Sequence, residues 1–245
     1  MDTNSTRAAI VTGGSRGIGR AAAERLAADG FAIVVNFAGN TAEADATVAA
    51  ITGEGGRAIA VRADVADEEA VQNLFDVTEE NFGGVDVVVN AAGNMVLAPL
   101  AELDLDAMDR MLRTNIRGTL VVDQQAVRRV RSGGTIINVS TSIIGLALPT
   151  YAAYAATKGA VEATTLILAR ELRGRDVTVN TVAPGPTATS LFLDGKDDAT
   201  IARMAAQPPL ERLGTPQDIA EVVAFLAGPG HWVNGQVLRA NGGII

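Results

Sequence analysis

The sequence predicts a single-domain, Rossmann-type doubly wound α/β fold, with about seven parallel strands and helices on both faces of the sheet. Short apolar, β-branched runs alternate with longer helical patterns through nearly all of the 245 residues. Most of these runs are continuously apolar, as expected of parallel strands that helices cover on both faces. No repeat, low-complexity tract or linker interrupts the alternation, so residues 1–245 are expected to form one domain.

Each strand and helix is predicted from its own run of residues. The strands are short and rich in Val, Ile and Thr, and they fall at 8–12, 32–36, 57–61, 85–89, 135–139, 177–182 and 236–239. The helices have a helical apolar periodicity, and they fall at 17–29, 41–53, 67–82, 104–131, 151–173 and 215–227. Gly30, Gly83 and Gly133 follow helical patterns, where C-terminal caps are common. Thr215 followed by Pro216 predicts the N-terminus of the last helix.

One stretch breaks the alternation of strands and helices. Residues 184–214 contain four prolines and a short helical pattern at 199–206. A long irregular stretch in a compact domain often serves as a lid or binding loop. We therefore expect residues 185–214 to form a substrate-binding loop or lid, with an ordered surface excursion as the alternative.

Composition excludes several classes of site and partner. The chain has no Cys and a single His, His231, so we expect no disulfide, no cysteine nucleophile and no metal site. Its net charge of −8 argues against binding to nucleic acid or to an anionic membrane. No apolar run approaches the ~20 residues needed to cross a bilayer. Residues 1–7 are polar and lack the apolar core of a signal peptide, so a cytoplasmic protein is expected.

A glycine-rich turn joins the first predicted strand to the first predicted helix. The segment from Thr12 to Gly19 has the spacing Gly-x-x-x-Gly-x-Gly. Its glycines allow a tight turn and a close approach of the backbone to a pyrophosphate, and the helix N-terminus offers free N–H groups. The domain is therefore predicted to bind a dinucleotide.

The end of the second predicted strand indicates which dinucleotide is bound. An Asp or Glu at this place would bind both ribose hydroxyls and repel a 2′-phosphate. This chain has the neutral Asn36 there, and Arg16 is well placed to meet a phosphate. Both observations favour NADP(H) over NAD(H), with a solvated helix-end charge as the alternative reading of Arg16.

Tyr154 and Lys158 lie four residues apart in a predicted helix, so their side chains share one face. A tyrosine normally titrates near pH ~10. A neighbouring ammonium favours the phenolate, so we expect Lys158 to lower the pKa of Tyr154 and make it a proton donor or acceptor. A solvated pair on a helix surface is the alternative.

Taken together, these motifs resemble the short-chain dehydrogenase/reductase family over nearly the whole chain. They occur in the family's order: the 12–19 turn, Asp64-Val65, Asn90-Ala91-Ala92-Gly93, Asn115, the Ser/Thr segment 140–142, Tyr154 with Lys158, and Pro184-Gly185. The likeness is strongest to 3-oxoacyl-[acyl-carrier-protein] reductases and general carbonyl reductases.

The resemblance implies a role for each matching position. Lys158 would bind the nicotinamide ribose, Asn115 would position Lys158 through a water, and Tyr154 would act on the substrate oxygen. Asp64 and Val65 would contact adenine, and Pro184, Gly185 and Thr187 would hold the carboxamide. The full set of implied cofactor-binding residues is Gly13, Ser15, Arg16, Gly17, Ile18, Gly19, Asn36, Phe37, Ala38, Asn40, Asp64, Val65, Asn90, Ala92, Gly93, Ser140, Tyr154, Lys158, Pro184, Gly185 and Thr187.

The chain departs from the family's pattern at two places. Ala91 stands where the family often has Asn, so one hydrogen bond that supports the sheet is expected to be missing. The family also places its substrate-orienting Ser thirteen residues before the Tyr, and this position is Thr141. Ser142 lies twelve residues before Tyr154 but matches the family's Ser-x-x-Gly pattern. Residue type favours Ser142, and ungapped spacing favours Thr141. We favour Ser142 and keep Thr141 as the alternative.

The predicted reaction is hydride transfer from NADPH to a ketone or aldehyde, with Tyr154 as the proton donor. A 3-oxoacyl thioester on an acyl-carrier protein is the alternative substrate, since Arg128, Arg129 and Arg131 could form a basic rim. A dinucleotide-binding sensor without turnover is the alternative function.

The predicted substrate pocket is mainly apolar and comprises Asn94, Met95, Val96, Ile143, Leu146, Leu148, Leu191, Phe192 and Met204. The resemblance also implies a homotetramer, with one interface through the helices at 104–131 and 151–173 and another through the last helix, the last strand and Ile244-Ile245.

Overall fold

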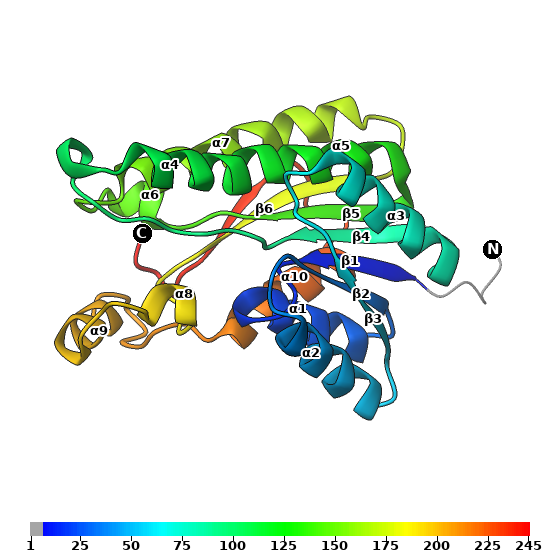
Figure 1. Ribbon diagram of the computed structural model, residues 1–245, viewed down its shortest axis with the longest axis horizontal. Coiled ribbons are helices and arrows are strands. Elements are labelled where there is room, and N and C mark those ends of the chain that lie inside the picture. The colour runs from blue at the N-terminus through cyan, green and yellow to red at the C-terminus, as the bar shows by residue number, and fades with distance from the viewer. Residues whose placement is uncertain (1–6) are drawn as a thin grey trace.

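The computed structural model describes residues 7–245, and it consists of one seven-stranded parallel sheet between two layers of helices (Figure 1). The sheet order is β3-β2-β1-β4-β5-β6-β7. The strands are β1 (Ala8–Thr12), β2 (Ala32–Phe37), β3 (Arg57–Arg62), β4 (Val85–Asn90), β5 (Val130–Val139), β6 (Thr178–Pro184) and β7 (Val237–Ala240). The predicted doubly wound fold is therefore confirmed.

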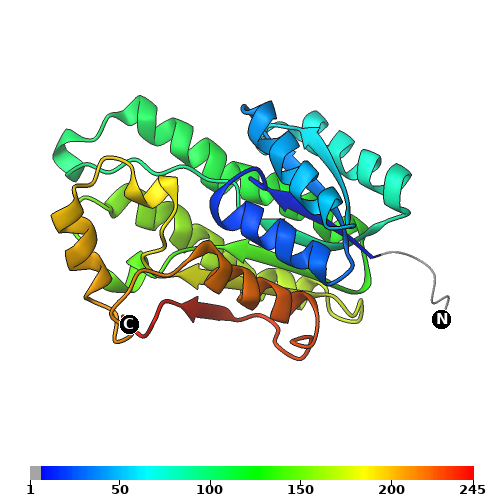
Figure 2. The ribbon, with the colours of Figure 1, turned by 90° about the horizontal axis from the view of Figure 1, so that it is seen from below.

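Two apolar clusters hold the layers together, one on each face of the sheet. On one face, α1 (Gly17–Ala28), α2 (Thr41–Gly53) and α10 (Pro216–Ala227) bury Leu26, Ile51 and Ile219 against the strands (Figures 1 and 2). On the other face, α3 (Glu68–Phe82), α5 (Thr119–Arg129) and α7 (Ala152–Glu171) pack around Phe75 and Val122. Because β1 and β4 lie in the middle of the sheet, their residues are buried on both faces, which explains their continuous apolar runs.

The sequence rules for helix ends hold at most of the predicted positions. Thr215 and Asp218 form a capping box at the start of α10. Gly83 ends α3 in the left-handed conformation, and Gly30 follows α1 with φ +89°. Gly133 is different, because it lies inside β5 with φ +80° and caps no helix.

The predicted helix 104–131 is the main departure from the sequence prediction. It comprises α4 (Leu105–Leu112), a π-helical segment η2 (Arg113–Gly118) and α5, and it ends at Arg129 because β5 begins at Val130. Val130 pairs with Val85, and the register of β4 and β5 shifts before Val87 pairs with Thr135. Glycines at 133 and 134 suit this irregularity, since a side chain at Gly134 would come within 2.4 Å of the Asp86 carbonyl oxygen.

The irregular stretch after β6 carries two short helices, α8 (Ser190–Leu193) and α9 (Asp198–Ala205). The remaining short elements are η1 (Leu100–Glu102) and α6 (Ile143–Leu146). None of the helices in residues 7–245 is long and apolar enough to cross a membrane. Of the polar start predicted over residues 1–7, only Arg7 belongs to the described part of the chain.

Candidate active site

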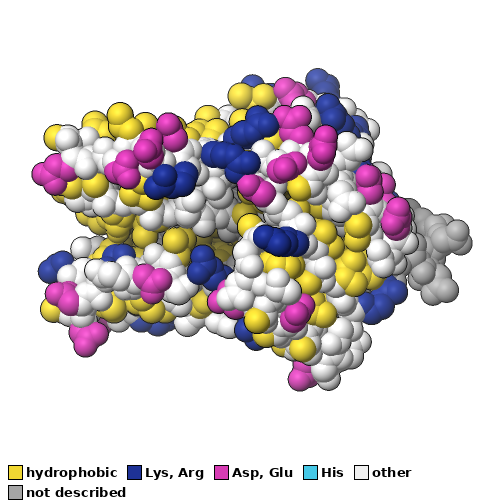
Figure 3. All heavy atoms as spheres, viewed as in Figure 1, with side chains coloured by type: hydrophobic (Ala, Val, Ile, Leu, Met, Phe, Trp, Pro, Cys, Tyr) yellow, Lys and Arg dark blue, Asp and Glu magenta, His cyan; other side chains and the backbone are white. Residues whose placement is uncertain are grey.

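A cavity of about 570 Å³ lies where the strands β1, β2, β4, β5 and β6 reach their carboxyl ends. It runs from the glycine-rich turn to the segment that carries α8 and α9. In the space-filling view it opens as a hollow between the part of the molecule that carries α4 and the part that carries α9 (Figure 3). The carboxyl ends of a doubly wound sheet are the usual place for a ligand.

The glycine-rich turn is shaped by contacts that exclude side chains. Gly13 has φ +62°, and a Cβ there would lie 2.9 Å from Ala92 Cα. A Cβ at Gly19 would lie 2.2 Å from the Gly13 carbonyl oxygen. The backbone therefore turns tightly at the start of α1 and leaves the cavity side open. All the predicted residues of this turn, Gly13, Ser15, Arg16, Gly17, Ile18 and Gly19, line the cavity.

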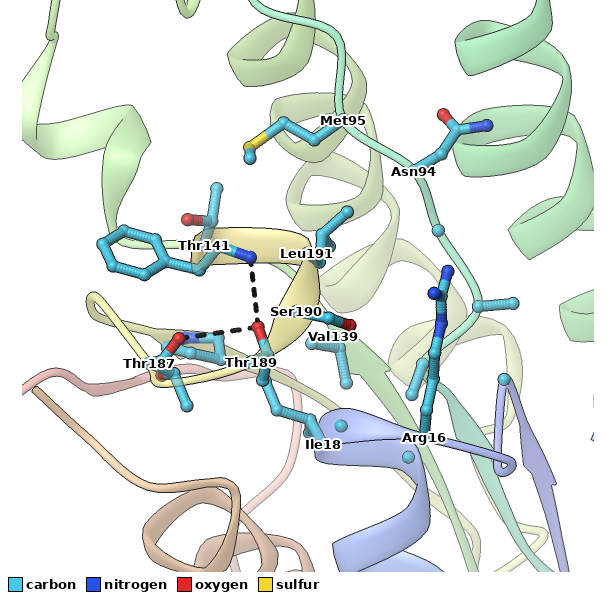
Figure 4. A pocket seen from close by; sticks show the side chains of 18 of the residues that line it. Arg16, Ile18, Asn94, Met95, Val139, Thr141, Thr187, Thr189, Ser190 and Leu191 are labelled. Carbon is cyan, nitrogen blue, oxygen red and sulfur yellow. Dashed lines mark hydrogen bonds between the residues drawn. The ribbon is translucent and has the colours of Figure 1, made fainter. Parts of the chain in front are cut away.

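Arg16 extends from the start of α1 into the cavity (Figure 4). It is exposed, and it forms no ion pair with any side chain in residues 7–245. Phe37, Ala38 and Asn40 line the same end of the cavity. This end therefore offers a guanidinium that is free to bind an anionic group.

Asn36 is 1% exposed, and its amide nitrogen serves the sheet. Nδ2 donates to the carbonyl oxygens of Val61 at 3.3 Å and Ala63 at 3.0 Å. These bonds join the ends of β2 and β3. The residue lines the cavity as predicted, but the structure adds a supporting role that the sequence did not indicate.

Asp64 and Val65 follow β3 and line the same end of the cavity. One Asp64 oxygen accepts the Ala66 N–H at 2.9 Å, and the other accepts Arg113 Nη1 at 2.5 Å. Burial alone would raise the pKa of Asp64, but these two hydrogen bonds outweigh it and the pKa is lowered. Asp64 is therefore an ionised carboxylate with a fixed orientation.

Asn90 is the one predicted cofactor-binding residue that does not line the cavity. It is buried, and Nδ2 donates to Asp123 Oδ1 and Asn138 Oδ1, both at 2.8 Å. Asn138 Nδ2 donates to the other Asp123 oxygen at 3.1 Å. This buried triad joins α5 to β4 and β5. Since burial raises the pKa of Asp123 to about 7, Asn90 belongs to a titratable core network rather than to the cavity wall.

Tyr154 and Lys158 lie one turn apart on α7, and both are buried at the cavity. Lys158 Nζ donates to the Val139 carbonyl oxygen at 2.8 Å, which fixes the ammonium at the end of β5. Burial lowers the pKa of Lys158 to about 8. Burial, helped by repulsion from Tyr151, raises the pKa of Tyr154 to about 12. The sequence analysis predicted a lowered pKa for Tyr154. The structure gives a raised pKa, because burial of the phenol disfavours the phenolate, an effect that the sequence analysis did not consider.

Asn115 lies in the π-helical segment η2 and is fully buried behind the cavity. Its Oδ1 accepts the Asn94 N–H at 3.0 Å, and its Nδ2 donates to the Asn94 carbonyl oxygen at 2.9 Å. Nδ2 also donates to Thr157 Oγ1 at 3.1 Å, and Thr157 Oγ1 donates to the Tyr154 carbonyl oxygen at 2.8 Å. Thr157 was missed by the sequence analysis, although its place three residues after Tyr154 puts it near the same face of α7.

The two candidate hydroxyls differ in the hydrogen bonds they make. Ser142 is 2% exposed, and its Oγ donates to the Ala183 carbonyl oxygen at 3.0 Å and accepts from Asn241 Nδ2 at 3.0 Å. Thr141 is half-buried at the cavity (Figure 4), and its Oγ1 accepts the Ile143 N–H at 3.3 Å. The Thr141 hydroxyl therefore keeps its proton for a ligand, whereas the Ser142 proton is used within the protein.

The predicted substrate end is largely present at the cavity. Asn94, Met95, Ile143, Leu146, Leu191, Phe192 and Met204 line it. Val96 and Leu148 pack in the apolar cluster behind these residues and do not line the cavity. Tyr151 lines the cavity and was not predicted. Ser140, Pro184, Gly185 and Thr187, which were predicted on the cofactor side, also line it, as do Ala92 and Gly93.

Comparison with known proteins agrees with this arrangement. Residues 13–245 match a family model described as enoyl-(acyl carrier protein) reductase. A short-chain type dehydrogenase/reductase from Picea abies is 44% identical, over 97% of this chain and 92% of that protein.

The chain belongs to the short-chain dehydrogenase/reductase family. Other family members show what related chains bind or do. An NADPH-dependent aldehyde reductase-like protein from Arabidopsis thaliana is 40% identical, over 98% of this chain and 94% of its own length. A short chain dehydrogenase from Burkholderia cenocepacia, solved in complex with NADP, superposes with a TM-score of 0.91 at 39% identity, covering 97% of both chains.

The residues at the cavity fit a nicotinamide dinucleotide. The glycine turn leaves room for a pyrophosphate, and Arg16 is a free cation at the end where an adenosine phosphate would lie. Asn94 Oδ1 is buried and accepts no hydrogen bond from residues 7–245, so a ligand in the cavity could donate one to it. Lys158 and Thr187, to which the resemblance assigns the ribose and the carboxamide, line the same cavity as Tyr154.

Proposed function

We propose that this protein is an NADPH-dependent carbonyl reductase in which Tyr154 donates the proton to the substrate oxygen. The observation that carries the proposal is a buried, protonated Tyr154 at one cavity with Lys158 and a glycine-rich dinucleotide turn. The NADPH-dependent aldehyde reductase-like relative and the NADP-bound structure support the cofactor and the reaction class. The free Arg16 supports NADPH over NADH.

When bound, NADPH supplies a hydride to the carbonyl carbon, and the carbonyl oxygen gains the negative charge. Tyr154 holds its proton at neutral pH, because its pKa is about 12, and transfers that proton to the oxygen. Thr141 donates a hydrogen bond to the same oxygen and fixes its position. Lys158, whose pKa of about 8 leaves it mostly charged at pH 7, stabilises the phenolate that remains until solvent returns the proton.

The substitution Tyr154→Phe tests this mechanism. It removes the proton donor and keeps the ring, so carbonyl-dependent NADPH oxidation should fall by about 10²-fold or more. Binding of NADPH, followed by its fluorescence, should remain within a few-fold of the native value, because Tyr154 lies at the substrate end. Near-native turnover by the variant would contradict the proposal. Binding of NADPH by the native protein without turnover of any carbonyl compound would favour the sensor function instead.

The cavity favours uncharged carbonyl compounds over thioesters on an acyl-carrier protein. Arg129 is paired with Asp76 and Glu79, and Arg131 with Asp86, so neither is free to bind an acidic partner. Arg129 precedes β5, and Arg131 is the second residue of this strand. The cavity lies beyond Val139, at the opposite end of β5. Two of the three arginines of the expected basic rim are thus neutralised by acidic neighbours, which supports a small carbonyl substrate over a carrier-bound thioester. Turnover of an aryl ketone well above that of an acetoacetyl thioester would support a carbonyl substrate, and the reverse order would restore the thioester.

We also propose that residues 185–214 close over the substrate end and that the protein is a homotetramer. Thr187, Leu191, Phe192 and Met204 of this segment line the cavity. Exposed apolar side chains support association through the helices named in the sequence analysis, namely Leu120 on α5 and Leu166 and Ile167 on α7. A monomeric mass in sedimentation would contradict the tetramer.

A further inference from the structure

Tyr151 places a second aromatic ring beside the proton donor. It is the N-cap residue of α7, three residues before Tyr154, and it lines the cavity half-buried. The two ring centroids are 6.5 Å apart with an interplanar angle of 61°, an edge-to-face arrangement. The mechanism above does not use Tyr151, and its hydroxyl makes no hydrogen bond with residues 7–245. Its ring therefore belongs to the wall that a substrate of Tyr154 would contact.

The backbone holds Tyr151 in this place at an energetic cost. Thr150, directly before it, has φ +73°, a left-handed conformation that is unfavourable for a β-branched residue. The Thr150 carbonyl oxygen accepts the Ala98 N–H at 3.2 Å, which ties the turn to the segment after β4. The Tyr151 carbonyl oxygen then accepts the Ala155 N–H at 2.8 Å and starts the helix. The backbone that carries Tyr151 is therefore held on both sides.

The wall around Tyr151 carries no charge of its own. In residues 7–245, the ionisable cavity-lining groups other than the two tyrosines are Arg16, Glu43 and Asp64 at the adenosine end and Lys158 beneath Tyr154. Around Tyr151 the cavity is lined by Met95, Ile143 and Leu146, with Met204 on the α9 segment. Methionine side chains adapt to ligands of different outline and contact aromatic rings favourably. A substrate at this end is therefore uncharged, and flat rings fit its lining.

Phe192 is the other aromatic side chain at the substrate end, and it is less available. Lys196 Nζ lies 4.6 Å from its ring centroid, so that one face of the ring already binds a cation. Phe192 also belongs to α8, in the segment proposed to move, whereas Tyr151 is the N-cap residue of α7, the helix that carries Tyr154. Tyr151 is thus the aromatic ring with a fixed position relative to the proton donor.

We propose that Tyr151 is a specificity-determining residue, whose ring contacts the substrate and makes the cavity select planar aryl aldehydes and ketones over saturated ones of the same size. The proposal rests on the carbonyl reductase function and deepens it. An aryl group conjugated to the carbonyl would present its ring to Tyr151 while its oxygen meets Tyr154. A cyclohexyl group has similar bulk but no π face, so it gains only the apolar contact.

The test compares benzaldehyde with cyclohexanecarbaldehyde, using the ratio of their kcat/KM values in each variant. Tyr151→Leu should lower the ratio of benzaldehyde to cyclohexanecarbaldehyde about five-fold relative to the native protein, as expected for the loss of one aromatic contact. Tyr151→Phe keeps the ring and should keep the ratio. Phe192→Leu is the matched control, since it removes the other ring and should change both substrates alike.

The possible outcomes separate this inference from the function on which it rests. If the native protein reduces neither aldehyde nor any other carbonyl compound, the carbonyl reductase function fails. If it reduces both and Tyr151→Leu leaves the ratio unchanged, or if Phe192→Leu alone lowers it, the role of Tyr151 is overturned. The Tm of Tyr151→Leu guards against a folding defect, and Tyr151→Ile, which fills part of the space without a ring or a sulfur atom, should lower the ratio as Tyr151→Leu does.

Discussion

Asn115 donates a hydrogen bond from Nδ2 to Oγ1 of Thr157 at 3.1 Å, and through it the π-helical segment of one crossover is joined to the helix of Tyr154. The Thr157 hydroxyl passes the connection on by donating to the Tyr154 carbonyl oxygen. Because the Asn115 side chain also bonds to the N–H and the carbonyl oxygen of Asn94, one buried amide sets the spacing between the cavity wall and α7.

Thr157→Val removes this hydroxyl without changing the side-chain volume much. A buried amide N–H then loses its partner, which should lower the free energy of unfolding by about 1–3 kcal/mol. We expect kcat to fall about ten-fold, because about 1.4 kcal/mol of lost alignment corresponds to that factor, with the KM for NADPH nearly unchanged. Thr157→Ser should restore kcat. Equal kcat values for the Val and Ser variants would show that the hydroxyl only stabilises the fold.

The substrate-orienting hydroxyl is expected to be that of Thr141. Thr141→Ala should reduce kcat by about 10²-fold, the usual cost of losing one donor to a developing oxyanion. Ser142→Ala should mainly reduce thermal stability, because its hydroxyl bridges Ala183 and Asn241. Thr141→Ser is the control and should remain active. A larger loss of kcat in Ser142→Ala than in Thr141→Ala would reverse the assignment and restore the choice favoured from residue type.

Arg16→Gln tests the cofactor preference. The glutamine keeps a polar side chain but loses the charge that would bind a 2′-phosphate, so the KM for NADPH should rise about 10–100-fold. The KM for NADH should stay nearly constant, because NADH has no phosphate at this position. Steady-state kinetics with both cofactors measures the ratio. A parallel rise for NADH and NADPH would place the guanidinium elsewhere on the cofactor.

The sequence predicted most of the fold and of the cavity because both depend on local patterns. Apolar runs define the strands, and the glycine turn, Tyr154 and Lys158 are recognised because several motifs occur together in one order along the chain. The missing parts depend on contacts between distant residues. The hydrogen bond from Asn241 to Ser142 spans 99 positions, and Asn90 meets Asp123 and Asn138 only when three elements pack together. The sign of the Tyr154 pKa shift depends on burial, which no motif reports.

Thr150→Gly should stabilise the protein by relieving the strained turn before Tyr151. Thr150 has φ +73°, where a β-branched residue costs roughly 1–3 kcal/mol, and glycine adopts this conformation freely. Glycine also loses more conformational entropy on folding than threonine does. With this loss subtracted, we expect the free energy of unfolding to rise by about 1 kcal/mol and the Tm by about 2–4 °C. Thr150→Ala is the control with little gain, since alanine also disfavours positive φ. A lower Tm for the glycine variant would mean that Thr150 makes contacts worth more than its strain.

Asp123 should make the stability of the protein depend on pH. Its pKa is raised from the model-peptide value of 3.8 to about 7, because burial disfavours the carboxylate more than the amides of Asn138 and Asn90 favour it. A folded-state pKa above the unfolded one means that the folded chain binds the proton more tightly. Near pH 4, Asp123 therefore costs the folded state little stability. The loss of stability grows as the pH rises towards 7, and it levels off above that pH.

Asp123→Asn removes this titration and keeps a hydrogen-bonding side chain of the same size. The Tm of the variant minus that of the native protein should increase between pH 5 and pH 8, by roughly 5 °C if the full shift is expressed. Asp45→Asn, which alters an exposed carboxylate that forms no ion pair or side-chain hydrogen bond in residues 7–245, is the control and should show no such trend. A difference between Asp123→Asn and the native protein that stays constant with pH would mean that Asp123 keeps one protonation state in both the folded and the unfolded chain. In that case, the Asn90–Asp123–Asn138 triad would be a fixed hydrogen-bond network whose contribution to stability is the same at pH 5 and at pH 8.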